Sequence, residues 1–191
     1  MLDQSTESDA VATLRSIYND NGVTLLCMDL ISFGIDKIIY IEAIDLLNIL
    51  LLSSRGSSTL IQQKIYSYLI EVDSILFFEL IHDLINYLKS WSAKDAYFKR
   101  IREKEDNLKS ILPPELNIFD LIQSMCDDGF IPNKNQFREQ LGNRRSIDIF
   151  QSIVSYMSLI TKSENNHINI YILTSLFKTV LRLVQVSIII I

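Results

Sequence analysis

The sequence contains few of the residues that interrupt helices or build chemical sites. Its 191 residues include five glycines, three prolines, two cysteines and two histidines. So few helix breakers favour long helices over strands joined by turns. The cysteines and histidines are too far apart for a zinc site, and no glycine-rich phosphate-binding loop is present. The composition therefore points away from metal and nucleotide chemistry.

Basic residues are fewer than acidic residues in this sequence. Lysine and arginine total 18 against 23 acidic residues, for a net charge of −5. Such a balance creates no field that attracts nucleic acid. Met1–Ala10 is acidic and polar and lacks the pattern of a signal peptide, so we expect a cytosolic chain. Cys27 and Cys126 are then expected to be reduced, buried thiols.

Two apolar stretches are long enough to be compared with membrane spans. Ile35–Leu52 is interrupted by charged and amide residues, of which Glu42, Asp45 and Asn48 fall on one helical stripe. Two carboxylates near a bilayer centre are costly, so this stretch predicts a core helix buried on three sides. Val180–Ile191 has only twelve residues, too few to cross a bilayer. No transmembrane segment is predicted in this chain.

Apolar residues recur every three or four positions along most of the chain, which predicts helices. A turn is expected at residues 128–133. The predicted helices cover residues 9–18, 23–32, 36–53, 59–70, 74–88, 115–127, 135–141, 146–163 and 168–185. Short turns between helices make consecutive ones antiparallel neighbours. The predicted fold is all-α, with stacked antiparallel helices in a solenoid-like (armadillo- or HEAT-like) array or an irregular bundle.

Composition divides the chain at two places. From Lys89 to Lys109 seven basic and four acidic residues replace the apolar pattern, and Pro113-Pro114 ends this stretch. The predicted organisation is a disordered N-terminus (1–8), a helical subdomain (9–88), a polar helical connector (89–112), a second helical subdomain (113–186) and an apolar tail (187–191).

Chemical motifs are sparse. His82 and His167 stand alone, and no serine lies in a GxSxG turn. Asp127-Asp128-Gly129 lacks the alternating oxygen ligands and the terminal glutamate of a calcium loop, so we interpret it as a helix end. The sequence therefore predicts no catalytic, cofactor-binding or metal-binding residue, no small-molecule ligand and no enzyme activity.

Four basic side chains fall within a turn-rich stretch of twelve residues, namely Lys134, Arg138, Arg144 and Arg145. One interpretation is a contact with a phosphate or an acidic neighbouring domain. The other is a solvated surface in which an arginine compensates a helix dipole. The spacing leaves both open.

Two stretches resemble a known family. Residues 19–83 contain NDNGVTLLCMDLI, then EAIDLLNILL, then SILFFELIHD, and residues 121–185 contain LIQSMCDDG followed by NQFREQLGN. In this order, and separated by a polar connector, they resemble the RIH-associated region of inositol-trisphosphate and ryanodine receptors, the intracellular calcium-release channels. The residues that we assign to the family motif are Gly22, Asp29, Glu42, Phe77, Phe78, Cys126, Asn135, Arg138 and Gln140.

The resemblance implies a cytosolic, non-enzymatic helical module that relays conformational change to a pore formed by other parts of a tetrameric channel. It also implies a location on the cytosolic face of the endoplasmic reticulum or another calcium-store membrane. Asn135, Arg138 and Gln140 are then expected to be structural and to satisfy carbonyl groups at a turn between stacked helices. The chain departs from the family pattern at Ser53–Gly56 and in its final residues, VSIIII.

Two other functions remain open from the sequence. A free-standing helical scaffold of armadillo or HEAT type would bind a partner protein with the same amphipathic helices. An enzyme would need a polar pocket with perturbed titratable groups, and the sequence assembles none.

Overall fold

A computed structural model describes residues 13–14, 16–52, 58–71, 74–94, 112–127, 130–140, 147–163 and 167–185. Every regular element within these ranges is a helix, which confirms the all-α prediction. The helices are α2 (Val23–Phe33), α3 (Lys37–Leu51), α4 (Ser58–Glu71), α5 (Ile75–Ser92), η1 (Pro114–Leu116), α8 (Asn117–Met125), α9 (Ile131–Glu139), α10 (Ile149–Thr161) and α11 (His167–Val184). The predicted disordered N-terminus (1–8) and apolar tail (187–191) lie outside the described residues.

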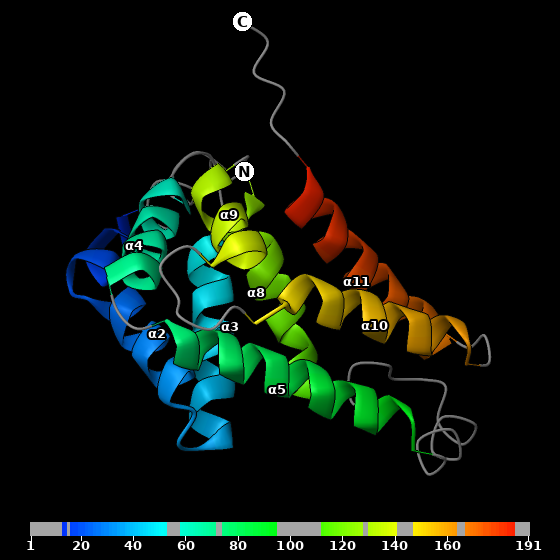
Figure 1. Ribbon diagram of the computed structural model, residues 1–191. Coiled ribbons are helices and arrows are strands. Elements are labelled where there is room, and N and C mark those ends of the chain that lie inside the picture. Colours follow the sequence, from blue (N-terminus) through cyan, green and yellow to red (C-terminus); the bar gives the residue numbers. More distant parts are fainter. Residues whose placement is uncertain are drawn as a thin grey trace, which may run out of the picture.

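The helices form an irregular bundle (Figure 1). α2, α3 and α4 pack on one another at one end, and α10 and α11 pack together at the other. Contacts between helices far apart in the chain join the two ends, because α3 packs on α8, α4 on α9 and α5 on α10. A solenoid is held together by neighbouring repeats, so this cross-packing favours the bundle over the solenoid-like alternative.

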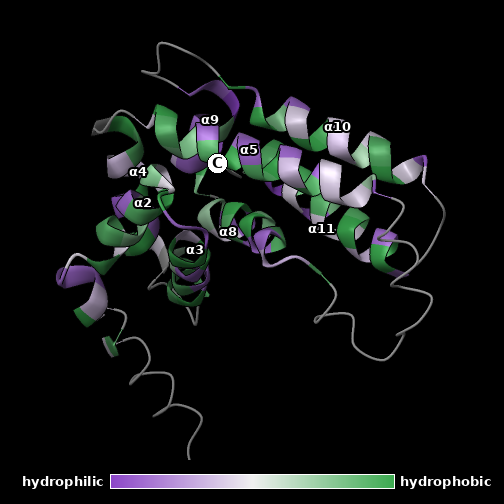
Figure 2. Ribbon diagram, turned by 90° about the horizontal axis from the view of Figure 1, so that it is seen from below, coloured by the Kyte–Doolittle hydropathy of each residue, from purple (hydrophilic) through white to green (hydrophobic). Residues whose placement is uncertain are grey.

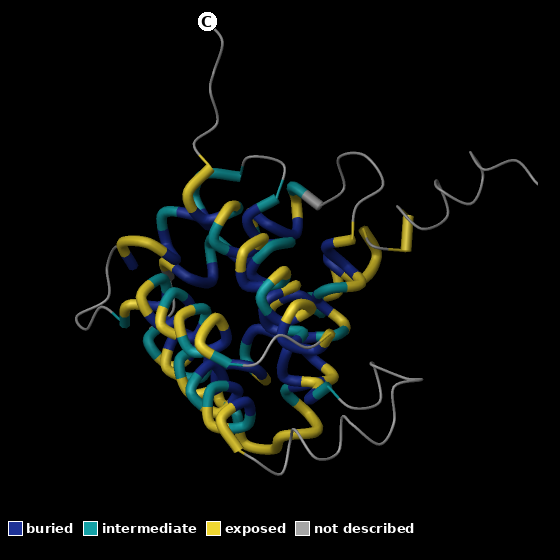
Figure 3. The backbone as a smooth tube through the Cα atoms, turned by 90° about the vertical axis from the view of Figure 1, so that its right-hand side faces the viewer, coloured by how far each residue is buried: buried dark blue, intermediate teal, exposed yellow. Residues whose placement is uncertain are grey.

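One hydrophobic core runs through both parts of the bundle. Its fully buried residues come from helices on both sides of the predicted connector, and buried and exposed stretches alternate along most helices (Figure 3). Phe77 and Ile81 on α5 share this core with Phe119 on α8 and Ile153 on α10. The predicted subdomains 9–88 and 113–186 therefore pack against each other. Residues 95–111, most of the predicted connector, lie outside the described residues.

Local chemistry sets the bounds of the first helices. Gly22 and Gly34 flank α2 in the left-handed region, at φ 77° and 54°. At Gly34 a Cβ atom would lie 3.2 Å from Leu80 Cδ1, so both conformation and space favour glycine there. Asp36 then caps α3, since its Oδ1 accepts hydrogen bonds from the amides of Ile38 and Ile39 at 2.8 and 3.3 Å.

The prediction of a helix buried on three sides is wrong for α3. Ile38, Ile49 and Leu52 are 72%, 59% and 61% exposed, although Figure 2 shows green, apolar residues round most of this helix. The core covers only the face that carries Ile44 and Leu47. Hydropathy marks which residues tolerate burial, but the number of neighbouring helices decides how many faces are covered.

The apolar row Leu26, Leu30 and Phe33 on α2 also lies on the exposed side. The face turned to the core carries Cys27, Met28 and Ile31 together with the buried Thr24, whose hydroxyl donates to Asn19 Oδ1 at 3.2 Å. A helix this rich in apolar residues has no single apolar stripe, so periodicity does not identify its inner face.

Two predicted boundaries differ from the structure. α9 begins at Ile131 and includes residues predicted as a turn, because Pro132 occupies the first helical turn, where its missing amide hydrogen costs nothing. α5 continues past Leu88 to Ser92. The reason is packing on α10, where the Ser92 hydroxyl and the Tyr156 hydroxyl lie 2.7 Å apart in a buried hydrogen bond.

None of the described helices is both long enough and apolar enough to cross a membrane.

Both cysteines are free and buried, as predicted. Burial raises the pKa of Cys27 to about 11 and that of Cys126 to about 12, from an ordinary value of 9.0. Unfolding therefore releases thiol protons above pH 9, so the stability present below that pH is lost as pH rises toward the folded pKa values. We expect the free energy of unfolding, from urea titrations between pH 7 and 10.5, to fall with increasing steepness.

The slope of the unfolding free energy against pH gives the number of protons released on unfolding. In the Cys126→Ala variant this number should fall by about one at alkaline pH, whatever the substitution does to stability at pH 7. An unchanged slope in this variant would contradict the assignment.

Candidate functional site

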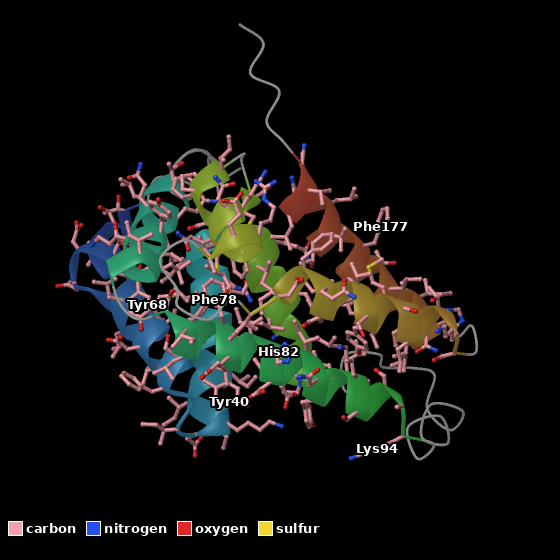
Figure 4. All side chains as sticks on the ribbon, in the orientation of Figure 1. Tyr40, Tyr68, Phe78, His82, Lys94 and Phe177 are labelled. Atoms are coloured by element: carbon pink, nitrogen blue, oxygen red, sulfur yellow. The ribbon has the colours of Figure 1, made fainter. Side chains whose placement is uncertain are left out.

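An aromatic cluster brings the two family-like stretches together. Phe77 and Phe78 on α5 contact Phe137 on α9, with ring centroids 6.4 and 5.6 Å apart in edge-to-face geometry. All three side chains are fully buried. In Figure 4 Phe78 lies toward the middle of the molecule, whereas Phe177 on α11 points outward. Phe77 and Phe78 of the family motif thus join α5 to Phe137 on α9, about sixty residues further along the chain.

Gln140 closes the C-terminal end of α9. Its backbone is left-handed at φ 47°, unusual for a residue with a side chain. Its amide pairs with Ile147 in both directions, because Nε2 donates to the Ile147 carbonyl and Oε1 accepts from the Ile147 amide, the latter at 2.8 Å. The Gln140 side chain therefore joins the two ends of the segment that connects α9 to α10.

The other two polar residues predicted at this turn have a different role. Arg138 Nη2 donates to Asn135 Oδ1 at 2.6 Å on the exposed side of the same helix. The buried Asn133, which the sequence did not single out, donates to the carbonyls of Met125 at 2.9 Å and Gln62 at 3.4 Å. Of the three residues expected to satisfy carbonyls here, Gln140 does so, whereas Arg138 and Asn135 bond to each other among the described residues.

Lys134 does not belong to a solvated basic surface, one of the two interpretations that the sequence left open. It is 2% exposed, and its ammonium donates to the carbonyl of Gln185 at 3.1 Å, just beyond the end of α11. A cation at the C-terminal end of a helix is stabilised by the free carbonyls and the helix dipole. The dipole of α11 is therefore compensated by the buried Lys134 of α9. Arg144 and Arg145 lie outside the described residues.

The remaining motif residues are dispersed. Asp29 Oδ1 accepts from the Tyr68 hydroxyl at 2.9 Å and so links α2 to α4, while Glu42 is exposed on α3. Cys126 is buried at the end of α8. The structure does not gather these residues and Gly22 into one site, so their assignment to a structural family motif stays a prediction.

An open groove of about 560 Å³ lies where α3, α8 and α11 meet, and we call it the α8 groove. It is lined by Asp45, Asn48, Ile49, Leu52, Asn117, Asp120, Gln123, Ser124, Asp127 and Arg182. α3 contributes an apolar edge, α8 a polar floor and α11 a basic residue. This mixture suits a ligand that is itself amphipathic.

Hydrogen bonds from α8 hold the walls of the α8 groove in place. Asn117 donates to Asp45 Oδ1 at 2.6 Å and accepts from Asn48 Nδ2 through its carbonyl at 3.1 Å. On the other side, Gln123 donates to Thr179 Oγ1 at 3.0 Å, and Arg182 pairs with Asp127 at 3.0 Å. The only sign of these contacts in the sequence is that polar residues such as Asn48 and Gln123 occur within apolar helices.

The electrostatics of the groove are dominated by carboxylates. Asp120 reaches solvent at the groove, yet the protein around it removes part of its hydration, which raises the pKa of its carboxyl. The nearby Lys178 opposes this shift, and the Asp45 carboxylate adds to it. Since Arg182 is engaged by Asp127, a net negative charge remains on the Asp45 and Asp120 side.

A histidine–serine contact links α5 to α10. His82 Nδ1 lies 3.0 Å from Ser152 Oγ, and the same hydroxyl lies 2.9 Å from the carbonyl of Asp148, to which it can donate. Within the part of the chain that the structure describes, no three His, Cys, Asp or Glu side chains come together as metal ligands.

Comparison with known proteins found a similarity in the C-terminal part of the chain. Residues 114–189 match the family model described as RyR and IP3R Homology associated. We call residues 114–189 the RIH-associated region, after the family that they match. No curated protein matched the chain. The match covers η1 and α8 to α11, and so includes Phe137, Gln140, Lys134 and the floor of the α8 groove.

The RIH-associated region is anchored to the preceding helices at its first residues. The buried carboxylate of Glu115 pairs with the ammonium of Lys37, at the start of α3. This hydrogen bond is the main reason that the pKa of Lys37 is raised. Together with Asn117 and Asp45, the pair fixes the start of the region to α3.

Proposed function

We propose that the chain is a non-enzymatic helical module of an intracellular calcium-release channel and relays conformational change through protein contacts. The observation that carries this proposal is the packing of Phe137, inside the RIH-associated region, on Phe77 and Phe78 outside it. Close-packed interiors have low compressibility and transmit strain. A displacement applied to α2–α5 is therefore passed to α8–α11 as a movement of the whole body.

The module's partners are the remaining parts of the channel, which we propose to be tetrameric. Its place is the cytosolic face of the endoplasmic reticulum or of another calcium-store membrane. Exposed apolar residues on α3 and α11, such as Ile38 and Phe177, support a module that contacts other protein segments.

The size and location of the native protein test this proposal. We expect an antibody against the chain to detect a membrane-bound assembly far larger than a 191-residue protein, by cell fractionation followed by detergent-solubilised native electrophoresis. The assembly should resist washing with high salt and carbonate, which remove peripheral proteins. Recovery as a small protein in the soluble fraction would contradict the channel role.

A free-standing scaffold is the second candidate, and the α8 groove favours it, because a groove of this size fits a segment of a partner. The same fractionation distinguishes the two functions, since a scaffold is recovered without a membrane-bound channel assembly.

A further inference from the structure

The α8 groove has the chemistry of a site for one kind of partner segment. Its α3 edge presents Ile49 and Leu52, both more than half exposed. Exposed apolar residues next to a concave surface are typical of helix-in-groove recognition. The edge therefore favours a ligand with an apolar stripe.

The floor of the groove favours a cation with several hydrogen-bond donors. Asp45 and Asp120 carry two carboxylates whose charges influence each other. Between α3 and α8, Asn48 Oδ1 is buried and has no hydrogen-bond partner among the described residues. A guanidinium group presents five donors in a plane and no acceptor, so it can engage two carboxylates together, whereas an ammonium is a strongly hydrated point charge.

We propose that the α8 groove binds an amphipathic helix of a partner protein, with an arginine beside Asp45 and Asp120 and apolar residues on Ile49 and Leu52. The proposal rests on the proposed function in one respect, that the chain acts through protein contacts. Anionic ligands such as nucleic acid or phosphate are disfavoured, because Asp127 already occupies Arg182. Within the described residues the carboxylates do not form a metal-ligand cluster.

A selection experiment with the 191-residue chain tests the partner chemistry. A displayed library of helical peptides, with leucine fixed on one stripe and the flanking positions randomised, is selected on the wild-type chain and, separately, on a Asp45→Asn, Asp120→Asn variant. We expect arginine to be enriched at one position next to the leucine stripe on the wild-type chain. This enrichment should disappear on the variant.

The affinity of a selected peptide then defines the contribution of each surface. We expect about a tenfold loss of affinity or more on the Asp45→Asn, Asp120→Asn variant, and on replacing the arginine with its neutral isostere citrulline, since each change removes charge-assisted hydrogen bonds. Ile49→Ser should also weaken binding. Glu79→Gln, which removes an exposed carboxylate of α5 that does not line the groove, should change affinity less than about twofold. Circular dichroism and thermal midpoints establish that the variants are folded.

The proposal is overturned if no peptide is selected, if the selected peptides lack an enriched arginine, or if the groove variants bind them as tightly as the wild type. This outcome is separate from the fractionation result. A groove that selects arginine helices in a chain recovered as a small soluble protein would overturn only the channel role. A channel-sized assembly whose groove selects nothing would overturn only this proposal.

Discussion

Replacing Phe137 with alanine is expected to lower the free energy of unfolding by about 3–5 kcal/mol, the usual cost of truncating a buried phenylalanine. Phe137 is 1% exposed and contacts both Phe77 and Phe78, so the variant loses apolar burial and two edge-to-face ring contacts and leaves a cavity between α5 and α9. Urea unfolding followed by circular dichroism measures the loss.

Phe177→Ala is the matched control for this prediction. Phe177 is 53% exposed on α11, so the same change of side chain should alter the free energy of unfolding far less, by about 0.5–1 kcal/mol. Equal losses in the two variants would show that α9 does not pack on α5 as described. They would also remove the main support for the relay, since Phe137 is the contact between the RIH-associated region and the rest of the chain on which that proposal rests.

Gln140→Ala is expected to lower the free energy of unfolding by about 2–3 kcal/mol, because both hydrogen bonds to the backbone of Ile147 are lost while the left-handed conformation remains. Thermal and urea unfolding measure this loss. Hydrogen exchange should become faster at the Ile147 amide, whose acceptor is the Gln140 side chain, before it changes in α5.

Gln140→Gly separates the hydrogen bonds from the backbone conformation. Glycine adopts a positive φ without steric cost, so this variant should be more stable than Gln140→Ala by about 1 kcal/mol, although it lacks the same hydrogen bonds. Arg138→Ala, at an exposed neighbour whose partner is Asn135, should stay within about 0.5 kcal/mol of the wild type. If alanine at position 140 is as stable as the wild type, the side-chain bridge has no structural role.

The helices themselves were predictable because their signals are local. Apolar residues at helical spacing, with few glycines and prolines between them, identified α2 to α5 and α8, α10 and α11 within a few residues. Helix boundaries were less predictable where a residue type occurs both in turns and at the start of helices. Pro132 suggested a turn, but it begins α9, because a proline in the first helical turn resembles one in a loop when only the sequence is seen.

The candidate site was predictable only in part. The family resemblance drew attention to Phe77, Phe78 and Gln140, and the structure gives each of them defined contacts. The α8 groove was not predicted, because its lining comes from three helices that are separated from one another by more than forty residues along the chain. The burial of Lys134 was not predictable for a related reason, since the carbonyl that its ammonium binds belongs to Gln185, fifty-one residues further along the chain.

The sequence by itself determined that this protein is helical, that its interior is apolar and that residues 114–189 match the RIH-associated family, because helix formation and family motifs depend on residues close together in the chain. Only the tertiary structure decided which faces of α2 and α3 are covered, that Phe137 meets Phe77 and Phe78, and that acidic and apolar residues share a groove. Those features depend on which helices become neighbours, and a local pattern of apolar residues is compatible with many such arrangements.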